Sequence, residues 1–193
     1  MEKVREMIDG FLKKMSENEF MMTTLFDIPP EMINSDVETE DDEYKGWQPI
    51  DSIITDDDIQ LLEQDIGYPL PLSYREFLKY KHFVELFITD LSIRFQPHLP
   101  DRNIRFLREL VFEMMEPEFI IDRGYIYFAD FSDYGLLCFD ANAHQPDNEY
   151  KIVYIDHEIL EEAHPYADSF IELLESDQEK GNRFIEYLNN VDL

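Results

Sequence analysis

The sequence predicts an α+β fold in which α-helices flank one antiparallel β-sheet. Three apolar runs, at 125–129, 136–139 and 152–155, are rich in β-branched and aromatic residues and are separated by turn-forming residues. This pattern is typical of an antiparallel meander. Before and after these runs, apolar residues recur at helical spacing. An apolar fraction of 44% in 193 residues is enough for one packed domain, or for one domain with an extension.

The N-terminal segment predicts an amphipathic helix followed by a linker. We expect its apolar stripe to dock onto the body of the protein rather than to bind a membrane or a partner helix. The stripe consists of Val4, Met7, Ile8, Phe11, Leu12 and Met15. Residues 27–46 then contain Pro29 and Pro30 and an acidic run without apolar periodicity, as in a linker. This divides the chain into residues 1–46, the helix and acidic linker, and residues 47–193, the α+β domain.

Two capped helices are predicted next. Thr55 precedes three aspartates that suit the positive end of a helix dipole, and Gly67 is placed to end that helix. Ser73 and Glu76 have the spacing of a capping box, which predicts that Ser73 opens a second helix.

The rest of the chain predicts a strand at 83–88, a helix at 104–114 and two C-terminal helices around 170–174 and 184–188. The helix at 104–114 carries a basic stripe, which we expect to form ion pairs with neighbouring carboxylates. The stripe consists of Arg102, Arg105 and Arg108.

The chain is strongly acidic, with 44 Asp and Glu against 16 Lys and Arg and a formal charge of −28. Such a surface repels phosphate backbones and anionic lipids, so we predict no direct nucleic-acid binding and no membrane partner. It attracts a basic protein, although acidity also serves solubility alone. The carboxylates are densest at 36–65, where twelve of them face only Lys45.

The single cysteine, Cys138, lies in an apolar run and cannot form an internal disulfide. We therefore expect a buried thiol in a reducing compartment. No stretch has the composition of a signal peptide or the length of a membrane span. The sequence predicts a cytoplasmic protein.

No catalytic site and no cofactor are predicted, because the chain contains no phosphate-binding glycine loop and no nucleophile elbow. On a helix, His157, Glu161 and His164 would share one face and could hold the metal of a hydrolase. We favour the alternative, a strand end that leads into a polar helix start. Asp130 and Asp133 invite an acid/base interpretation, but a turn explains them better.

Several segments, taken in order, resemble the SUKH superfamily. They are Trp47 to Ile53, the helix with Leu62 and Gly67, Leu70–Pro71 before Tyr74–Leu78, the runs 125–129, 135–140 and 152–158, and the helix 169–174. The resemblance implies a SUKH-like single domain that binds a partner protein and has no catalytic residues. Bacterial members resemble immunity proteins against toxins, often nucleases, and fungal members resemble regulators of cell-wall assembly. The chain departs from the family at 81–83, where Asn-Gly-Gly is usual, and in the length of 90–120.

Charge and resemblance together predict a non-enzymatic immunity-type protein that neutralises a cognate bacterial toxin, with a basic nuclease domain as the suggested class. The alternatives are an intracellular adaptor or regulator of the same fold and a nucleic-acid mimic that acts on a DNA-binding protein. For Trp47 two interpretations stay open, an exposed anchor and a residue that closes the core. The predicted partner-binding residues are Asp36, Glu38, Glu40, Asp41, Asp42, Glu43, Tyr44, Trp47, Asp130, Asp133 and Tyr134.

Overall fold

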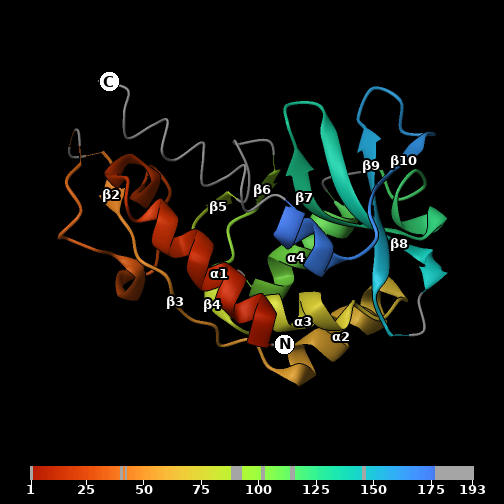
Figure 1. The fold of residues 1–193 in the computed structure, drawn as a ribbon, viewed down its shortest axis with the longest axis horizontal. Helices are drawn as coiled ribbons and strands as arrows, with labels where there is room; N and C mark the ends of the chain where they lie inside the picture. The colour runs from red at the N-terminus through yellow and green to blue at the C-terminus, as the bar shows by residue number, and fades with distance from the viewer. Residues whose placement is uncertain are drawn as a thin grey trace.

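The predicted antiparallel meander is the centre of a larger sheet. The computed structural model describes residues 2–39, 41, 43–87, 93–100, 103–113, 116–144 and 147–176. In these residues the meander comprises β7 (Tyr125–Phe131), β8 (Gly135–His144) and β9 (Tyr150–Asp156). β6 (Ile93–Phe95) and β5 (Leu86–Phe87) extend it beyond β7, and β10 (Ala163–Ala167) extends it beyond β9. The six strands run antiparallel in the order β10-β9-β8-β7-β6-β5, which confirms the α+β fold class (Figure 1).

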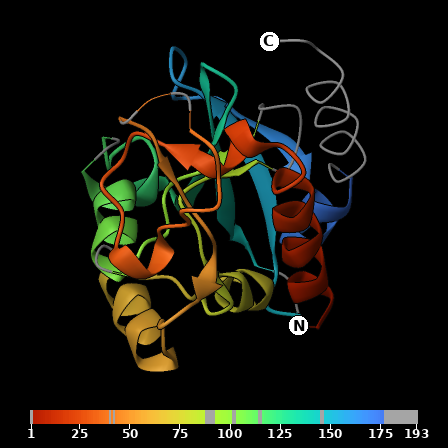
Figure 2. The ribbon, with the colours of Figure 1, turned by 90° about the vertical axis from the view of Figure 1, so that its left-hand side faces the viewer.

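Helices surround this sheet (Figures 1 and 2). They are α1 (Glu2–Met15), α2 (Asp56–Ile66), α3 (Leu72–Leu78), α4 (Asn103–Phe112) and the helical residues 170–176. The centre of the main core is aromatic, because the Phe170 ring lies 5.3 Å from Tyr74 and 5.4 Å from Phe77 of α3. The Phe128 and Phe139 rings of the sheet stack at 4.1 Å beneath them. The second C-terminal helix, expected at 184–188, lies outside the described residues.

Smaller elements connect these layers. Short 3-10 helices are η1 (Glu19–Met22), η2 (Pro30–Met32) and η3 (Ile121–Arg123). Two short strand pairs lie outside the main sheet, β1 (Thr23–Thr24) with β2 (Lys45–Gly46) and β3 (Ile50–Asp51) with β4 (Lys81–His82). The strand expected at 83–88 is only partly formed, because β5 covers only Leu86–Phe87 of the described residues. Its last expected residue, Ile88, lies outside the described part of the chain.

The docking predicted for the N-terminal helix is confirmed. Its apolar stripe lies in the same core cluster as the sheet residues Phe128 and Phe139. All six stripe residues are buried: Val4, Met7, Ile8, Phe11, Leu12 and Met15.

The opposite face of the sheet has a second, smaller apolar cluster. Its buried members are Ile120, Tyr127, Leu136, Cys138, Val153 and Ile155. Cys138 is fully buried, as predicted, and the low polarity around it raises the pKa of its thiol above the usual range. A thiol held neutral in this way is a poor nucleophile.

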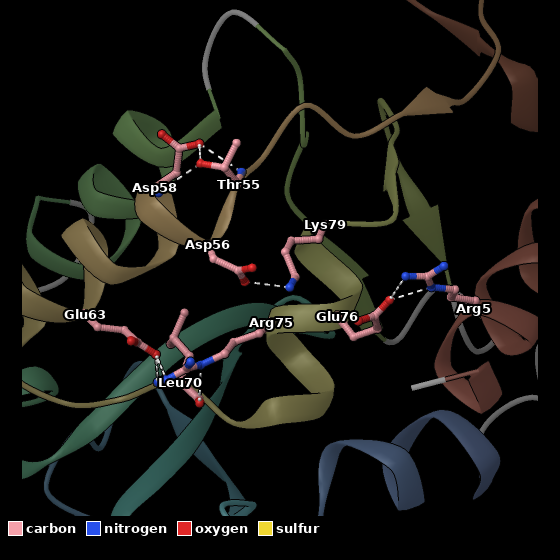
Figure 3. Close-up of polar contacts among 9 residues, drawn as sticks. All are labelled: Arg5, Thr55, Asp56, Asp58, Glu63, Leu70, Arg75, Glu76 and Lys79. Carbon is pink, nitrogen blue, oxygen red and sulfur yellow. Dashed lines mark hydrogen bonds and ion pairs between the residues drawn. The ribbon is translucent and has the colours of Figure 1, made fainter.

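Ion pairs and caps hold the helices around α3 (Figure 3). Thr55 and Asp58 form the capping box that begins α2, and Gly67 ends the helix with a φ of 78°, both as predicted for its termini. Lys79, the residue that follows α3, pairs with Asp56 over 2.6 Å. The side chain of Glu63 accepts from the Leu70 backbone N–H over 2.6 Å, which fixes the connection between the two helices.

The capping box predicted at Ser73 is wrong. α3 begins at Leu72, directly after Pro71, and Ser73 is already inside the helix. The Ser73 backbone N–H and hydroxyl donate instead to the two carboxylate oxygens of Glu149, over 2.9 and 2.6 Å. Glu76 pairs with Arg5 of α1. Residues distant in the sequence have replaced the local cap.

The helix predicted at 104–114 is confirmed as α4, although Met114 lies outside the described residues. Arg108 forms the expected ion pair, with Asp65 of α2 over 2.7 Å. Arg102 and the side chain of Arg105 lie outside the part that the structure describes.

Two histidines are buried side by side between β4 and the segment that follows β6. Their ring centroids are 4.6 Å apart. His82 Nε2 accepts from the Ile53 N–H over 3.1 Å, so its Nδ1 is protonated and donates to the His98 carbonyl over 2.9 Å. His98 Nε2 donates to the Leu78 carbonyl over 2.9 Å. Burial lowers the pKa of both rings, and that of His98 falls to about 3.

We expect this pair to make the fold acid-sensitive. Below pH 6.5 both histidines become protonated in the unfolded chain but stay neutral in the native protein. The free energy of unfolding therefore decreases as the pH is lowered, by up to about 1.4 kcal/mol per pH unit for each histidine. His98→Gln keeps a donor for the Leu78 carbonyl and removes the titrating ring. The variant should be less stable at pH 8, and the gap to the wild type should narrow by about 2 kcal/mol at pH 5. Chemical denaturation at both pH values measures the difference in the free energy of unfolding between the two proteins. An equal difference at pH 8 and pH 5 would contradict a native His98 with a lowered pKa.

Candidate partner-binding site

A three-segment ribbon beside α1 carries the first group of predicted binding residues. On one side of its middle segment the Trp47 N–H donates to the Met22 carbonyl over 2.8 Å. On the other side the Asn34 N–H donates to the Gly46 carbonyl over 2.9 Å. We call residues 22–24, 32–34 and 45–48 the N-terminal ribbon. It lies at the left-hand edge of the molecule in Figure 1 and faces the viewer in Figure 2.

The inner face of the N-terminal ribbon belongs to the core. Met22, Met32 and Trp47 are buried there, and Trp47 has 0% exposure. The interpretation of Trp47 as an exposed anchor is therefore wrong, and the alternative, that it closes the core, holds. The packing also demands glycine at position 46, because a Cβ there would lie 2.3 Å from the Asn34 carbonyl oxygen and 2.6 Å from Val37 Cβ.

The outer side of the same region exposes large apolar side chains. They are Phe20 at 58%, Leu25 at 59%, Phe26 at 50% and Ile33 at 41% exposure. Single exposed apolar residues are common, but these four fall within fourteen residues of the sequence, which makes this region a candidate interaction surface. No sequence pattern predicted these four exposed residues. The available signal was Leu25–Phe26, an apolar pair that fits neither helical nor strand periodicity.

Residues 35–44, which we call the acidic loop, follow the ribbon segment that contains Ile33. Asp36, Glu38, Asp41 and Glu43 are exposed, whereas Tyr44 is half-buried. Backbone N–H groups donate to side chains two residues earlier, from Asp36 to Asn34 over 3.1 Å and from Glu43 to Asp41 over 2.8 Å. These turns keep the chain on the surface. The remaining predicted members, Glu40 and Asp42, lie outside the described residues.

The basic residue next to the acidic loop does not neutralise it. Lys45 pairs with Asp27, outside the loop, over 2.6 Å. The loop carboxylates Asp36, Glu38, Asp41 and Glu43 therefore present a negative field beside the exposed apolar side chains. Such a surface suits a partner that offers both a basic patch and apolar contacts.

The second group of predicted residues lies elsewhere. The β7–β8 turn projects at the top of Figure 1, well separated from the acidic loop at the left-hand edge. Asp133 and Tyr134 are exposed in this turn. Asp130 is different, because it belongs to β7 and accepts hydrogen bonds from Arg94 over 2.8 Å and from Gln96 over 2.6 Å. The prediction that both aspartates lie in a turn is confirmed for Asp133 and wrong for Asp130. The charge of Asp130 is compensated by Arg94.

Asp130 also shapes the chemistry of its neighbours. The Tyr127 hydroxyl donates to it, and burial together with this negative charge raises the pKa of Tyr127 above the usual range. The hydrogen bond from Arg94 to Asp130 raises the pKa of the guanidinium in turn. These groups form one hydrogen-bonded network around Asp130.

No helix forms at His157, Glu161 and His164, so the metal arrangement is wrong. The interpretation that we favoured is confirmed only in its strand end, β9, because no helix start follows it. His164 lies in β10 opposite Tyr154, and the two other residues lie in the connection from β9. The β-strand places successive side chains on opposite faces, so the helical spacing has no meaning here. Within the described ranges no group of three His, Cys, Asp or Glu residues is arranged to hold a metal ion. No helix of the described part is long and apolar enough to span a bilayer.

Comparison with known proteins identifies one family. The model for SUKH_6, described as SMI1-KNR4 cell-wall, matches residues 56–174, which is more than half of the chain. The match includes α2, α3 and the strands β7 to β10, whereas α1 and the N-terminal ribbon precede it. No curated protein matches the chain.

Proposed function

The chain belongs to the SUKH superfamily, and on that premise we propose that it is a non-enzymatic immunity-type protein. It binds a cognate bacterial toxin with a basic active surface, such as a nuclease domain, and neutralises it by covering that surface. The proposal rests on the exposed apolar residues in and beside the N-terminal ribbon, which are close in sequence to the acidic loop: Phe20, Leu25, Phe26 and Ile33.

The two parts of this surface have different tasks. The carboxylates of the acidic loop accelerate association with a basic partner through long-range attraction. Exposed apolar side chains such as Leu25 and Phe26 slow dissociation once they are desolvated in the complex. A nuclease needs a basic cleft for its phosphodiester substrate, and an acidic loop can occupy such a cleft in place of the substrate.

Growth rescue tests the function itself. Co-expression of the chain with a toxin domain from a neighbouring gene should restore growth of a sensitive strain. An intracellular adaptor of the same fold would use the same kind of surface without rescuing any neighbouring toxin. Absence of rescue by stably expressed protein would therefore contradict the immunity proposal and favour the adaptor.

Removing the charge of the acidic loop should slow association with the rescued toxin. The variant combines Asp36→Asn, Glu38→Gln, Asp41→Asn and Glu43→Gln, and we expect an association rate about tenfold lower at low salt and a weaker salt dependence. Stopped-flow kinetics at several ionic strengths measure both. The control removes the same charge at exposed positions after α4, through Glu113→Gln, Glu116→Gln, Glu118→Gln and Asp122→Asn. Equal rates for both variants would remove the acidic loop from the interface.

Kinetics with the same toxin also test the exposed apolar residues. Leu25→Ser should raise the dissociation rate about fivefold or more, which corresponds to a loss of about 1 kcal/mol or more. Leu61→Ser on α2 is the matched control, because Leu61 is 60% exposed and Leu25 is 59% exposed. An equal effect of the two substitutions would show that Leu25 has no special part in binding.

A further inference from the structure

Five aromatic rings form a contiguous group where the main core reaches the surface near the β7–β8 turn. Phe131 is central. Its ring centroid lies 6.3 Å from that of Tyr134, 5.5 Å from that of Tyr154 and 5.1 Å from that of Tyr166. The Tyr154 ring stacks on His164 at 5.0 Å with an interplanar angle of 28°. We call these five residues the sheet-end aromatic cluster.

The strand register explains why these rings meet. Tyr154 of β9 and His164 of β10 are directly paired, so both side chains lie on the same face of the sheet. Phe131 is paired with Gly135, where a Cβ would lie 3.2 Å from Phe131 Cδ1, so the missing side chain leaves room for the ring. Phe131, Tyr154 and Tyr166 pack against the margin of the main core, while Tyr134 stays 45% exposed.

The surroundings of the cluster are acidic. Exposed carboxylates lie in the β7–β8 turn and in the connection from β9 to β10. Two arginines also contact this part of the structure and are already engaged, Arg94 with Asp130 and Arg123 with the Leu160 and Glu161 carbonyls. Asp133 is exposed in the turn beside Tyr134, and Glu162 Oε2 lies 3.7 Å from His164 Nε2. Lys151 pairs with Asp168 over 3.0 Å. A cation that approaches these rings therefore meets a negative field as well as the electron-rich ring faces.

In the described part of the chain, four contacts between a cation and an aromatic ring lie at other places. Among the described residues, Arg5 and Lys81 lie over Tyr80, Arg108 over Phe112, and Arg123 over Tyr125. Arg123 is further held by the backbone carbonyls of Leu160 and Glu161. Within the described chain, none of these cation–ring contacts uses a ring of the sheet-end aromatic cluster.

We propose that the sheet-end aromatic cluster binds an arginine side chain of a partner protein. The planar, weakly hydrated guanidinium can stack on the exposed Tyr134 ring and at the same time donate hydrogen bonds to a carboxylate such as that of the neighbouring, exposed Asp133. Lysine, a strongly hydrated point charge, fits this combination less well. The cluster is separate from the acidic loop (Figure 1), so the inference goes beyond the proposed function and does not depend on it.

Titration with a small arginine probe tests the proposal without any partner. N-acetylarginine methylamide added to the full, isotope-labelled chain should shift the amide resonances of residues 131–135 and 154, at millimolar concentrations. The neutral citrulline analogue, which has nearly the same shape, should bind about tenfold more weakly. The lysine analogue should also bind more weakly than arginine.

Variants locate the site. Tyr134→Leu replaces an exposed ring and should reduce arginine affinity severalfold, with unchanged dispersion of the amide spectrum as evidence of folding. Asp133→Asn should act in the same direction. Tyr44→Leu, a half-buried tyrosine of the acidic loop, is the control that should leave the affinity unchanged.

Three results would overturn the proposal. They are equal shifts with arginine and citrulline, an equal affinity for lysine, and shifts confined to the acidic loop. Because the probe is a free amino-acid derivative, failure here leaves toxin rescue unaffected, and failure of rescue leaves arginine binding unaffected.

Discussion

Trp47→Ala is expected to lower the free energy of unfolding by about 3–5 kcal/mol. Trp47 has 0% exposure and packs in the core beneath the N-terminal ribbon, so its removal leaves a large cavity. The substitution should also loosen the N-terminal ribbon, beside which Leu25 and Phe26 lie in the sequence, since the Trp47 backbone is bonded to Met22 there. Urea denaturation followed by circular dichroism measures the loss, because the variant lacks the only tryptophan.

Two further variants make this result specific. Trp47→Phe should cost clearly less, because it keeps most of the apolar volume and removes Nε1, a buried donor with no hydrogen-bond acceptor among the described residues. Tyr44→Ala, at a half-buried position three residues earlier, should change stability by about 1 kcal/mol or less. A Trp47→Ala protein as stable as the wild type would contradict the core assignment and restore the exposed-anchor interpretation.

Arg5→Ala is expected to destabilise the protein by about 3–5 kcal/mol. Glu76 of α3 is only 3% exposed, and the Arg5 side chain of α1 supplies its charge partner, with Nε 2.5 Å from Glu76 Oε1 (Figure 3). Truncating Arg5 leaves a buried carboxylate without a counter-charge, which costs more than the ion pair contributes. Thermal and urea unfolding measure the change.

The reverse substitution provides the internal control. Glu76→Gln leaves Arg5, whose side chain is 53% exposed, free to be hydrated, so we expect a smaller loss than for Arg5→Ala. Adding Glu76→Gln to Arg5→Ala should recover part of the stability, because a neutral amide needs no cation. If the double variant is less stable than Arg5→Ala by the full cost of Glu76→Gln, the two side chains do not interact and the explanation fails.

Much of the fold follows from short-range patterns. The apolar stripe of α1 predicted both the helix and its buried face, and the capping residues Thr55 and Gly67 predicted the ends of α2. The β-branched and aromatic runs predicted β7, β8 and β9. These signals succeed because helical periodicity, caps and alternation depend on residues within a few positions of one another.

The failures involve short or non-local elements. β10 contains Pro165 and the exposed His164, so it lacks the apolar alternation of a strand and exists through its pairing with β9. β6 has only three residues and depends on β7 in the same way. The cap expected at Ser73 failed because Glu149, 76 residues away, takes its hydrogen bonds.

The candidate sites also differ in how far the sequence predicted them. The acidic loop was predictable because charge density is a property of composition, and Asp36, Glu38, Asp41 and Glu43 are exposed. The apolar residues beside it and the sheet-end aromatic cluster were not predictable. Phe20, Leu25, Phe26 and Ile33 follow no periodicity, and the cluster collects rings from three strands and a turn.

The sequence by itself determined the α+β class, the helices with clear periodicity and caps, the central meander, the acidic character and the resemblance to the SUKH superfamily. Only the tertiary structure decided that Trp47 is buried, that Asp130 is compensated by Arg94, and that His164 belongs to a strand. The physical reason is that burial, charge compensation and strand pairing depend on partners brought close by folding, and a linear pattern records only neighbours along the chain.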